Sequence, residues 1–431
     1  MRKNQLVKAC AVAFVLVGAS AAHATAGFFP LAKGSAAGGM AGAATAMTED
    51  SFGGANNPAT MVFVGDRFDI EADLFRPVRS ASSSGGTSQY GPFNTNGDVK
   101  SNNELFLIPS FGYNRMIDSN KSVGVTFYAN GGMNTEYPAS SNGTLSGNGF
   151  GFGQGILGGD LMQAILAPTF AIKPTDNQSV GVSVLMAYQE FKAYGVNGFS
   201  NYSVASTALT DNGKESSTGL GIRLGYLAKL NNQWSVGASY SPKITMTKFN
   251  QYKGLFADGG SFDIPENYTL GLAFKPIPKM TLALDYQRIN YAGVPALGDP
   301  QGNLVINPQT MQATSGLLGS ANGAAFGWSN VNVYKFGLQY DYSSAWTLRA
   351  GYSKNNNPVS SANVQFNIIA PAVITDHATL GATYKMDKSN ELHFSFMHAF
   401  NNSVSGLGMN GQAITIKMKE DQLGFGYSYK F

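Results

Sequence analysis

The sequence is poor in cysteine. Cys10 is the only cysteine among the 431 residues, and it lies in a segment that we expect to be removed. Residues 1–24 have the basic start, the short apolar run and the small-residue A-x-A ending of a secretory signal peptide. We expect cleavage after Ala24, with Ala26 as the alternative site. The mature chain then has no thiol for a disulfide, a nucleophile or a zinc–thiolate site.

Charge is also scarce, at 13% of residues against about 25% in an average soluble domain. The leader holds three of the 29 cations and none of the 26 acids, so the mature chain is close to neutral and no nucleic-acid partner is expected. After the leader there is no apolar run of the roughly 20 residues that a membrane-spanning helix needs. An exported chain with little charge, 52 glycines and 20 tyrosines favours an outer-membrane β-barrel over a secreted β-sandwich.

The last ten residues, 422–431, have the side-chain pattern of a membrane strand. Every second residue from Leu423 to Phe431 is leucine or aromatic, and the residues between them are small or polar. A strand points alternate side chains to opposite faces, so one face here is aromatic. In a transmembrane barrel that face meets lipid and the other meets the lumen. We expect this stretch to close a barrel, and its terminal phenylalanine to be read by the barrel-assembly machinery.

The same alternation recurs along the chain and predicts about fourteen strands, an even number as in bacterial barrels. In the first of them Asp69, Glu71 and Asp73 share one face, which we assign to the lumen because a row of acids must face water or cations. The predicted strands are 67–75, 105–114, 123–130, 166–172, 180–188, 220–228, 234–240, 268–274, 282–286, 334–340, 346–352, 378–384, 392–400 and 422–431.

The connections between these strands alternate strictly between short and long. Short ones such as 115–121 and 385–391 are interleaved with long ones such as 77–104 and 401–421. Outer-membrane barrels have short periplasmic turns and long extracellular loops. The alternation therefore predicts a barrel with both chain ends in the periplasm.

Residues 25–61 differ in composition from the strands that follow. Most residues from 34 to 47 are glycine or alanine, and so many glycines weaken any helix. A flexible linker is one interpretation. A compact plug in the lumen is the other, and it is favoured because alanine and methionine outnumber serine and proline. The predicted organisation is a signal peptide at 1–24, a hatch at 25–61 and a transmembrane barrel at 62–431.

The small-residue stretch from Lys33 to Ala46, followed by Asn57-Pro58-Ala59, resembles the N-terminal hatch of the FadL/TodX family. These outer-membrane proteins transport long-chain fatty acids or aromatic hydrocarbons. Family members usually continue the tripeptide with Gly-Leu, whereas residues 60–61 here are Thr-Met. The resemblance implies a fourteen-stranded antiparallel barrel with the hatch in its lumen. It also implies passive uptake of a hydrophobic small molecule.

The predicted third strand ends at Asn130-Gly131-Gly132, and paired glycines mark a bulge, a bend or the start of a loop. In FadL/TodX proteins the third strand has an inward kink that opens the wall sideways, and this segment is similar in position and character. The resemblance therefore implies exit of the ligand into the bilayer here. It further implies that the start of the mature chain reaches an internal pocket, which makes Phe28 and Phe29 candidate ligand contacts.

Two of the long loops are unusually apolar, and exposed apolar residues are costly unless they pack together or bind something. Leu157, Leu161 and Met162 belong to the first of these loops, and Leu317 and Leu318 belong to the second. The resemblance suggests that they form an extracellular groove that first captures the ligand. Alternatively, the two loops pack over the barrel mouth as a lid.

Strand alternation also places Arg223, Lys335 and Arg349 on lumen-facing positions. Each of these cations is suited to bind the carboxylate of a fatty acid. The competing role is to pair with lumen acids such as Asp69 or Asp285 and so hold the hatch or the wall together. This second role is favoured for any single residue.

Enzyme signatures are weak in this chain. His393 and His398 fall on opposite faces of one predicted strand, so they cannot bind one metal from it. We expect no catalysis, no cofactor and no metal. The expected partners are a hydrophobic ligand, outer-membrane lipid, lipopolysaccharide and the barrel-assembly machinery, for a monomer in the outer membrane of a Gram-negative bacterium. The alternative function is a general diffusion porin for hydrophilic solutes.

Overall fold

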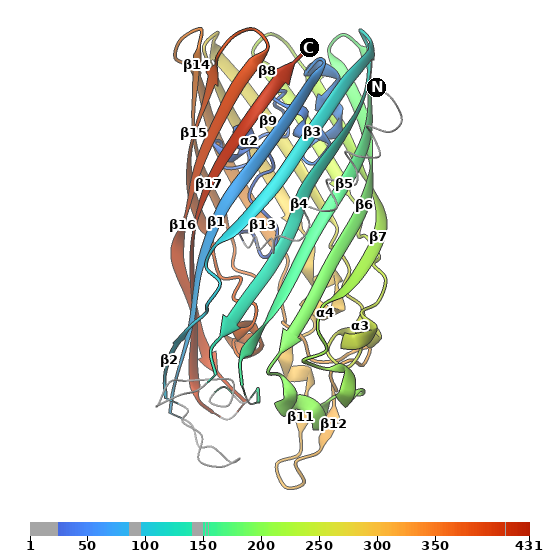
Figure 1. The fold of residues 1–431 in the computed structure, drawn as a ribbon, viewed down its shortest axis with the longest axis vertical. Coiled ribbons are helices and arrows are strands. Elements are labelled where there is room, and N and C mark those ends of the chain that lie inside the picture. Colours follow the sequence, from blue (N-terminus) through green and yellow to red (C-terminus); the bar gives the residue numbers. More distant parts are fainter. Residues whose placement is uncertain (1–24, 86–95, 140–149, 151, 154, 410) are drawn as a thin grey trace.

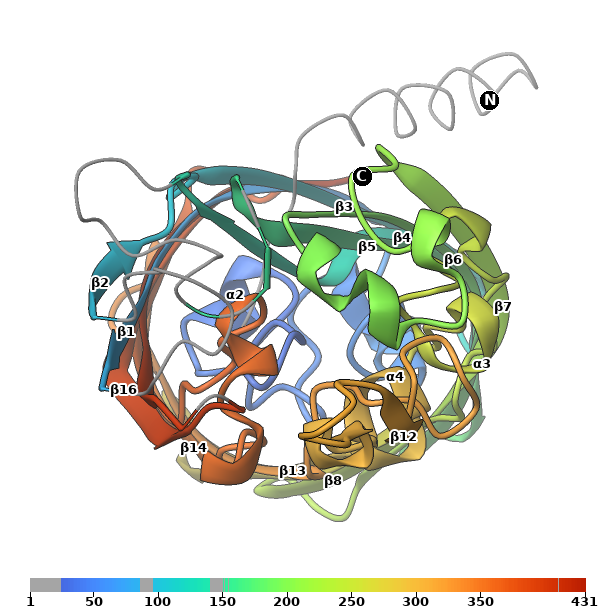
Figure 2. The ribbon, with the colours of Figure 1, turned by 90° about the horizontal axis from the view of Figure 1, so that it is seen from below.

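The computed structural model describes residues 25–85, 96–139, 150, 152–153, 155–409 and 411–431, which form a long β-barrel with its N-terminal segment inside (Figures 1 and 2). The expected signal peptide, residues 1–24, lies outside the described residues. Within these described ranges, no helix is long and apolar enough to cross a membrane.

Fourteen antiparallel strands of the described chain form the wall, and pairing of the first with the last closes it. The wall strands are β1 (Arg67–Ser84), β3 (Phe106–Asp118), β4 (Lys121–Tyr137), β5 (Leu157–Thr175), β6 (Gln178–Tyr194), β7 (Glu215–Lys229), β8 (Trp234–Ser241), β9 (Asn267–Ile277), β10 (Met280–Ile289), β13 (Val331–Asp341), β14 (Trp346–Asn355), β15 (Asp376–Lys385), β16 (Asn390–Leu407) and β17 (Ala413–Lys430). A further strand, β2 (Gly97–Lys100), pairs with the far end of β1. The predicted fourteen-stranded barrel is confirmed.

Short turns lie at one end of the barrel and long loops at the other, as the connection lengths predict (Figure 1). The long loops carry a small hairpin, β11 (Val305–Ile306) with β12 (Ala313–Ser315), and several short helices. These helices are η4 (Asn197–Tyr202), η5 (Ser206–Ala208), η6 (Asn250–Tyr252), α3 (Ala257–Gly260), η7 (Tyr291–Gly293), α4 (Pro295–Gly298), η8 (Gln301–Asn303), η9 (Ser361–Asn363) and η10 (Phe366–Ile368).

Several strands run further toward the long-loop end than the alternation predicts. β1 continues from the predicted end at Phe75 to Ser84, β16 continues to Leu407, and β17 begins at Ala413 instead of Gln422. The extensions of β1 and β16 are rich in serine and asparagine and show little contrast between an apolar and a polar face. The β17 extension does alternate, but its apolar residues, Ile414, Ile416 and Met418, are buried on the inner face, opposite to the outward apolar pattern of residues 423–431. The predicted boundaries were therefore too short.

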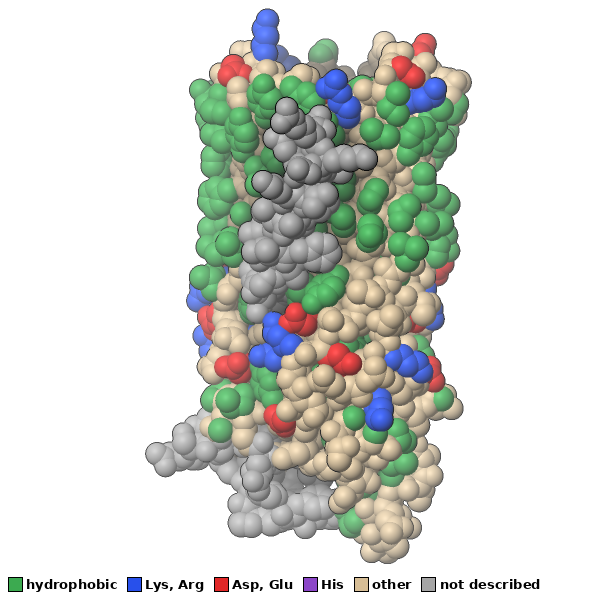
Figure 3. Space-filling model, turned by 45° about the vertical axis from the view of Figure 1, so that its right-hand side comes forward, with side chains coloured by type: hydrophobic (Ala, Val, Ile, Leu, Met, Phe, Trp, Pro, Cys, Tyr) green, Lys and Arg blue, Asp and Glu red, His purple; other side chains and the backbone are tan. Residues whose placement is uncertain are grey.

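The two faces of the wall differ as predicted. Ile70 and Leu74 on β1 point outward and are 48% and 36% exposed, whereas Asp69 and Glu71, on the alternate positions, are buried. Figure 3 shows the outward hydrophobic side chains as a broad belt over the short-turn half of the barrel, with charged residues gathered below it. The described chain thus presents an apolar surface of the kind that meets lipid.

Residues 25–63 lie inside the lumen (Figure 2), in its short-turn half (Figure 1), with three short helices, α2 (Ser35–Gly38), η2 (Ser51–Gly54) and η3 (Pro58–Phe63). Three hatch residues dock in the same way, each giving its backbone N–H and its hydroxyl to a single carboxylate oxygen of the wall. The pairs are Ser35 with Glu71, Thr45 with Asp285 and Ser51 with Asp69. The lumen acids therefore fix the hatch to the wall.

Asn57, the first residue of the Asn-Pro-Ala tripeptide, is fully buried and joins three parts of the structure. Its Oδ1 accepts a hydrogen bond from the Ala59 N–H, which caps η3, and its Nδ2 donates to the carbonyls of Thr45 and Tyr226 over 2.8 and 2.9 Å. Pro58 follows as the first helical residue, where it costs no hydrogen bond. The tripeptide thus fastens the end of the hatch to β7.

Lumen-facing glycines let the hatch backbone approach the wall closely. A Cβ at Gly181 on β6 would lie 2.4 Å from the carbonyl carbon of Pro58, and one at Gly237 on β8 would lie 2.2 Å from the Thr45 oxygen. Such distances exclude any side chain. The glycine content of the wall strands therefore has a packing role beside the hatch.

Candidate ligand-binding site

The wall has a seam between β3 and β4. β3 pairs with β4 only up to the Phe111–Phe127 pair, and beyond it β4 pairs with β5 alone. The register of β4 against β5 shifts between Ala129 and Gly131, so Asn130 forms a bulge. A bulge bends its strand. The expected bend at Asn130-Gly131-Gly132 is present, although β4 does not end there but continues to Tyr137.

A tight turn of the N-terminal segment closes this seam from the inside. Thr25 and Ala26 donate backbone hydrogen bonds to the Phe29 carbonyl, and the Phe28 carbonyl accepts one from Gly132 over 3.3 Å. A Cβ at Gly131 would lie 2.3 Å from the same Phe28 oxygen, so only glycine permits this contact. Of the two residues that the resemblance placed near a pocket, Phe28 therefore lies against the bend of β4, and the Phe29 ring packs against Phe28 and Tyr291.

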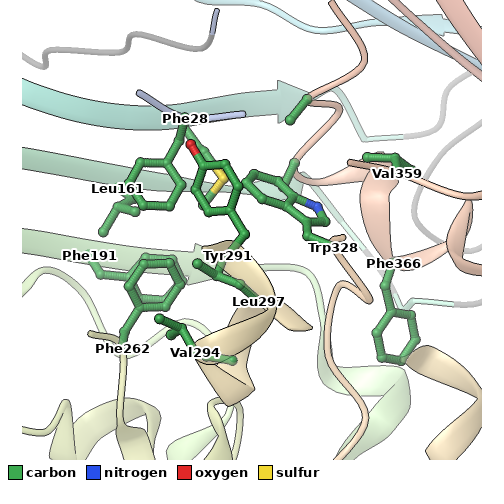
Figure 4. Packing of buried hydrophobic residues seen from close by; sticks show 14 of the residues in the cluster. Phe28, Leu161, Phe191, Phe262, Tyr291, Val294, Leu297, Trp328, Val359 and Phe366 are labelled. Atoms are coloured by element: carbon green, nitrogen blue, oxygen red, sulfur yellow. The ribbon is translucent and has the colours of Figure 1, made fainter. Parts of the chain in front are cut away.

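On the long-loop side of this turn lies an apolar pocket with an empty volume of about 650 Å³. Leu161 forms part of its wall and lies beside Phe28 (Figure 4). The lining is almost entirely apolar, and comes from β4, β5, β6 and five loops: Met133, Phe152, Gly159, Asp160, Leu161, Phe191, Val196, Phe199, Leu255, Phe256, Ala296, Leu318, Ala324, Ala325, Phe326, Phe366, Ile369 and Ala370. A pocket with this apolar lining suits a hydrophobic small molecule.

The structure brings together some of the predicted loop residues and separates others. Leu161 and Leu318 line the pocket, whereas Leu157 is buried in the same hydrophobic cluster and Met162 belongs to a different one. Leu317 is half-buried and is not part of the lining. The placement of Leu157, Leu161 and Met162 in a loop was wrong, because all three lie on β5. The run Gly158-Gly159-Asp160 interrupts the apolar alternation and hides that strand from sequence reasoning.

Most of the aromatic pocket wall was missed. Phe191 is on β6, while Phe199, Phe256 and Phe366 come from three long loops that are far apart in sequence. Each is an isolated phenylalanine in a segment without periodicity, so no local pattern distinguishes it. Their ring contacts, such as Phe191 with Phe256 at 4.6 Å between centroids, form only when the loops fold over the barrel.

The three predicted lumen cations all point inward, and each contacts the hatch. Arg223 donates to the Gly54 and Ala55 carbonyls and to the Tyr128 hydroxyl. Lys335 donates to the Leu31 carbonyl over 3.0 Å. Arg349 pairs with Glu49 over 3.3 Å. These contacts favour the predicted role of holding hatch and wall together.

A fourth cation, Lys33, was not anticipated. Its ammonium lies 5.4 Å from the centre of the Tyr128 ring and 5.8 Å from that of Phe29, and it makes no hydrogen bond or ion pair within the described residues. Burial, together with the guanidinium of Arg223 and the ammonium of Lys335, holds the pKa of Lys33 well below its ordinary value. An unpaired cation in an aromatic setting beside the seam is suited to an anionic group.

A family model described as outer membrane protein transport protein (OMPP1/FadL/TodX) matches residues 15–431. The chain belongs to this family. A sequence comparison with curated proteins finds no match.

Solved structures share the fold of this OMPP1/FadL/TodX protein at low sequence identity. The P. putida toluene transporter TodX has a TM-score of 0.66 at 18% identity, with 93% of this chain and 99% of that chain covered. A Pseudomonas aeruginosa FadL homologue has a TM-score of 0.68 at 15% identity, with 94% and 100% covered. The Ralstonia pickettii toluene transporter TbuX has a TM-score of 0.62 at 16% identity, with 93% and 99% covered.

Family membership fixes the orientation of the OMPP1/FadL/TodX chain. It is an outer-membrane transport protein, with its short turns on the periplasmic side and its long loops outside. The apolar pocket is therefore extracellular, and the hatch occupies the periplasmic half of the lumen. The seam between β3 and β4 lies between them.

Proposed function

We propose that this protein takes up hydrophobic small molecules across the outer membrane by diffusion. A ligand is captured in the extracellular apolar pocket, replaces the Phe28 turn at the bend of β4, and leaves sideways into the bilayer between β3 and β4. The observation that carries this proposal is the continuity of pocket, turn and seam. Leu161 lines the pocket beside Phe28, and the Phe28 carbonyl is bonded to Gly132.

Lateral exit suits an apolar ligand because the ligand passes from the pocket directly into the bilayer without entering the aqueous periplasm. The hatch, which we assign to residues 25–61 of the chain after removal of the leader, blocks the straight route through the barrel. Its three carboxylate contacts and the Asn57 contacts keep it docked. A diffusion porin for hydrophilic solutes needs an open aqueous lumen, so the purified protein should conduct ions weakly in planar bilayers. A large, stable conductance would support the porin alternative.

We further propose that the preferred ligand carries a carboxylate, as a long-chain fatty acid does, rather than being a neutral aromatic hydrocarbon. Lys33 supports this choice because it lies beside Phe29 and Tyr128 and pairs with no acid in the described part of the chain. Arg223 is close enough to the same tyrosine to donate a hydrogen bond to its hydroxyl over 3.0 Å. A carboxylate between these groups would be held by charge-assisted hydrogen bonds while its chain occupies the apolar pocket.

The experiment that separates the two ligand classes is uptake in a strain lacking this protein, with and without the gene restored. Restoring it should increase uptake of radiolabelled oleate more than uptake of toluene. If the gene restores oleate and toluene uptake equally, the proposed preference for a carboxylate is wrong. If it restores the uptake of neither ligand, the proposed uptake function is wrong. No enzymatic activity, cofactor or metal is part of this mechanism.

The outer surface supports the expected lipid partners. Toward the loops, Arg76 and Lys100 pair with Glu104, and Lys354 pairs with Asp376. We propose that these partly exposed cations contact lipopolysaccharide phosphates. We also propose that the barrel-assembly machinery recognises β17, and that the protein acts as a monomer.

A further inference from the structure

Tyr291 reaches from an extracellular loop down to the N-terminal turn. It is the first residue of η7, in the loop between β10 and β13, and it is fully buried. Its hydroxyl donates to the Ala26 carbonyl over 2.5 Å and accepts from the Phe29 N–H over 3.2 Å. One side chain of the loop thus joins the two ends of the turn that closes the seam.

The turn is shaped around this tyrosine ring. Gly27 has a φ of 72°, and a Cβ there would lie 2.5 Å from the Tyr291 ring. The Phe28 ring packs against the other side, with its centre 5.3 Å from that of Tyr291 (Figure 4). The position of the turn therefore depends on the position of the ring.

Tyr291 is also tied to the wall of the pocket by a short, hydrogen-bonded segment. The Val294 N–H donates to the Tyr291 carbonyl, and the Leu297 N–H donates to the Val294 carbonyl. Ala296, between these residues, lines the pocket. A ligand that pushes on Ala296 therefore pushes on a turn that ends at Tyr291.

A second contact leads to the same ring through Trp328. The backbone N–H of Trp328 donates to the Leu297 carbonyl over 2.7 Å, and its ring centre lies 5.2 Å from that of Tyr291, with the two rings at 90°. Phe326, which lines the pocket, lies 6.0 Å from the Trp328 ring. Two pocket-lining residues, Ala296 and Phe326, are thus each linked by a short series of contacts to Tyr291.

We propose that Tyr291 is the positioning residue that couples occupancy of the extracellular pocket to release of the N-terminal turn. With the pocket empty, its hydroxyl holds the turn closed through Ala26 and Phe29. A ligand that enters the pocket displaces the Ala296 segment, both hydrogen bonds break, and Phe28 leaves the bend of β4. This role presupposes the lateral uptake proposed above, and it names the contact that keeps the exit shut until a ligand arrives.

The test uses a single cysteine at position 26 as a reporter of the turn. Because Cys10 lies in the expected leader, an A26C variant on a C10S background has no other thiol. Ala26 is 2% exposed, so its replacement should react slowly with N-ethylmaleimide in the purified, detergent-solubilised protein. Y291F removes only the hydroxyl and should speed labelling about tenfold, as the loss of two buried hydrogen bonds implies. Oleate should speed labelling of A26C alone, and should add little to A26C/Y291F.

The matched control is Y252F. Tyr252 is equally buried in the extracellular core, and its hydroxyl donates to the Gly213 carbonyl, away from the N-terminal turn. A26C/Y252F should label as slowly as A26C and should respond to oleate in the same way. Heat-modifiable migration on gels verifies that each variant retains a folded barrel.

Two results would overturn the coupling. The first is that A26C/Y291F is labelled as slowly as A26C. The second is that oleate accelerates the labelling of A26C and of A26C/Y291F by the same factor. Cellular uptake separates this inference from the proposed function. Normal oleate uptake without any effect of oleate on A26C labelling would exclude the coupling alone. Failure of both oleate and toluene to be taken up would exclude the uptake function and the coupling with it.

Discussion

The Gly132 N–H donates a hydrogen bond to the Phe28 carbonyl over 3.3 Å. This bond joins the bend of β4 to the N-terminal turn at the start of the hatch. These residues are separated by more than a hundred positions in the chain. Their contact places a bulky aromatic residue against the part of β4, beyond Phe127, that no longer pairs with β3. The seam and its inner closure are therefore parts of one arrangement.

Replacing Gly131 by valine should slow oleate uptake several-fold. A Cβ at this position would lie 2.3 Å from the Phe28 oxygen, so the new side chain must displace the turn and fill the exit. Uptake of radiolabelled oleate into cells measures the effect. The control is G302V in an extracellular loop, where an added Cβ meets nothing within 4 Å. Unchanged uptake in a G131V protein that remains heat-modifiable would argue against exit at this bend.

Replacing Lys33 by methionine should weaken oleate binding about tenfold, because a charge-assisted hydrogen bond contributes roughly 1.5–3 kcal/mol. Binding of toluene should not change, since it has no anionic group. Ligand depletion with the purified protein gives both affinities. K388M, which removes an exposed lysine in a periplasmic turn, is the matched control and should bind oleate normally. An equal loss for oleate and toluene in K33M would indicate a packing defect instead.

Oleate binding should take up a proton through Lys33. The pKa of this lysine is lowered by burial and by the nearby Arg223 and Lys335, so a fraction is neutral at pH values above that lowered pKa. A bound carboxylate favours the charged ammonium and raises the pKa again. Oleate affinity should therefore fall as the pH rises from the lowered pKa toward the ordinary lysine value of about 10.4.

Calorimetry in two buffers of different ionisation enthalpy measures this proton uptake directly. The wild-type protein should give buffer-dependent binding enthalpies, and K33M should give equal ones. If K33M still takes up a proton, another group titrates on binding and the assignment to Lys33 is incorrect.

Replacing Asn57 by alanine should loosen the hatch while leaving the barrel closed. The substitution removes the cap of η3 and the two hydrogen bonds to Thr45 and Tyr226, at a cost of roughly 2–4 kcal/mol. Proteolysis should cut the hatch of N57A faster than that of the wild type. N56A is the neighbouring control, because Asn56 donates one hydrogen bond, to the Lys33 carbonyl, and should have a smaller effect. Equal proteolysis of N56A and N57A would contradict an anchoring role specific to Asn57.

Alternation along single strands was enough to predict how side chains divide between lipid and lumen. Asp69, Arg223 and Lys335 all face inward as their positions indicate, since a side chain's face depends only on its own strand. The same reasoning failed at Leu161, because Gly158 and Gly159 remove the apolar signal from the start of β5. It also failed at Lys33, which lies in a segment without any period.

The sequence by itself determined that the chain makes a fourteen-stranded barrel, which side of each strand meets lipid, and at which end the long loops lie. These properties follow from a repeat of two residues and from connection lengths, both of which are local. Only the tertiary structure decided that Phe28 closes the seam, that Tyr291 holds the Phe28 turn, and that phenylalanines from separate loops line one pocket. Those contacts join residues up to 265 positions apart, and they exist only because closure of the barrel brings the hatch and the loops into one lumen.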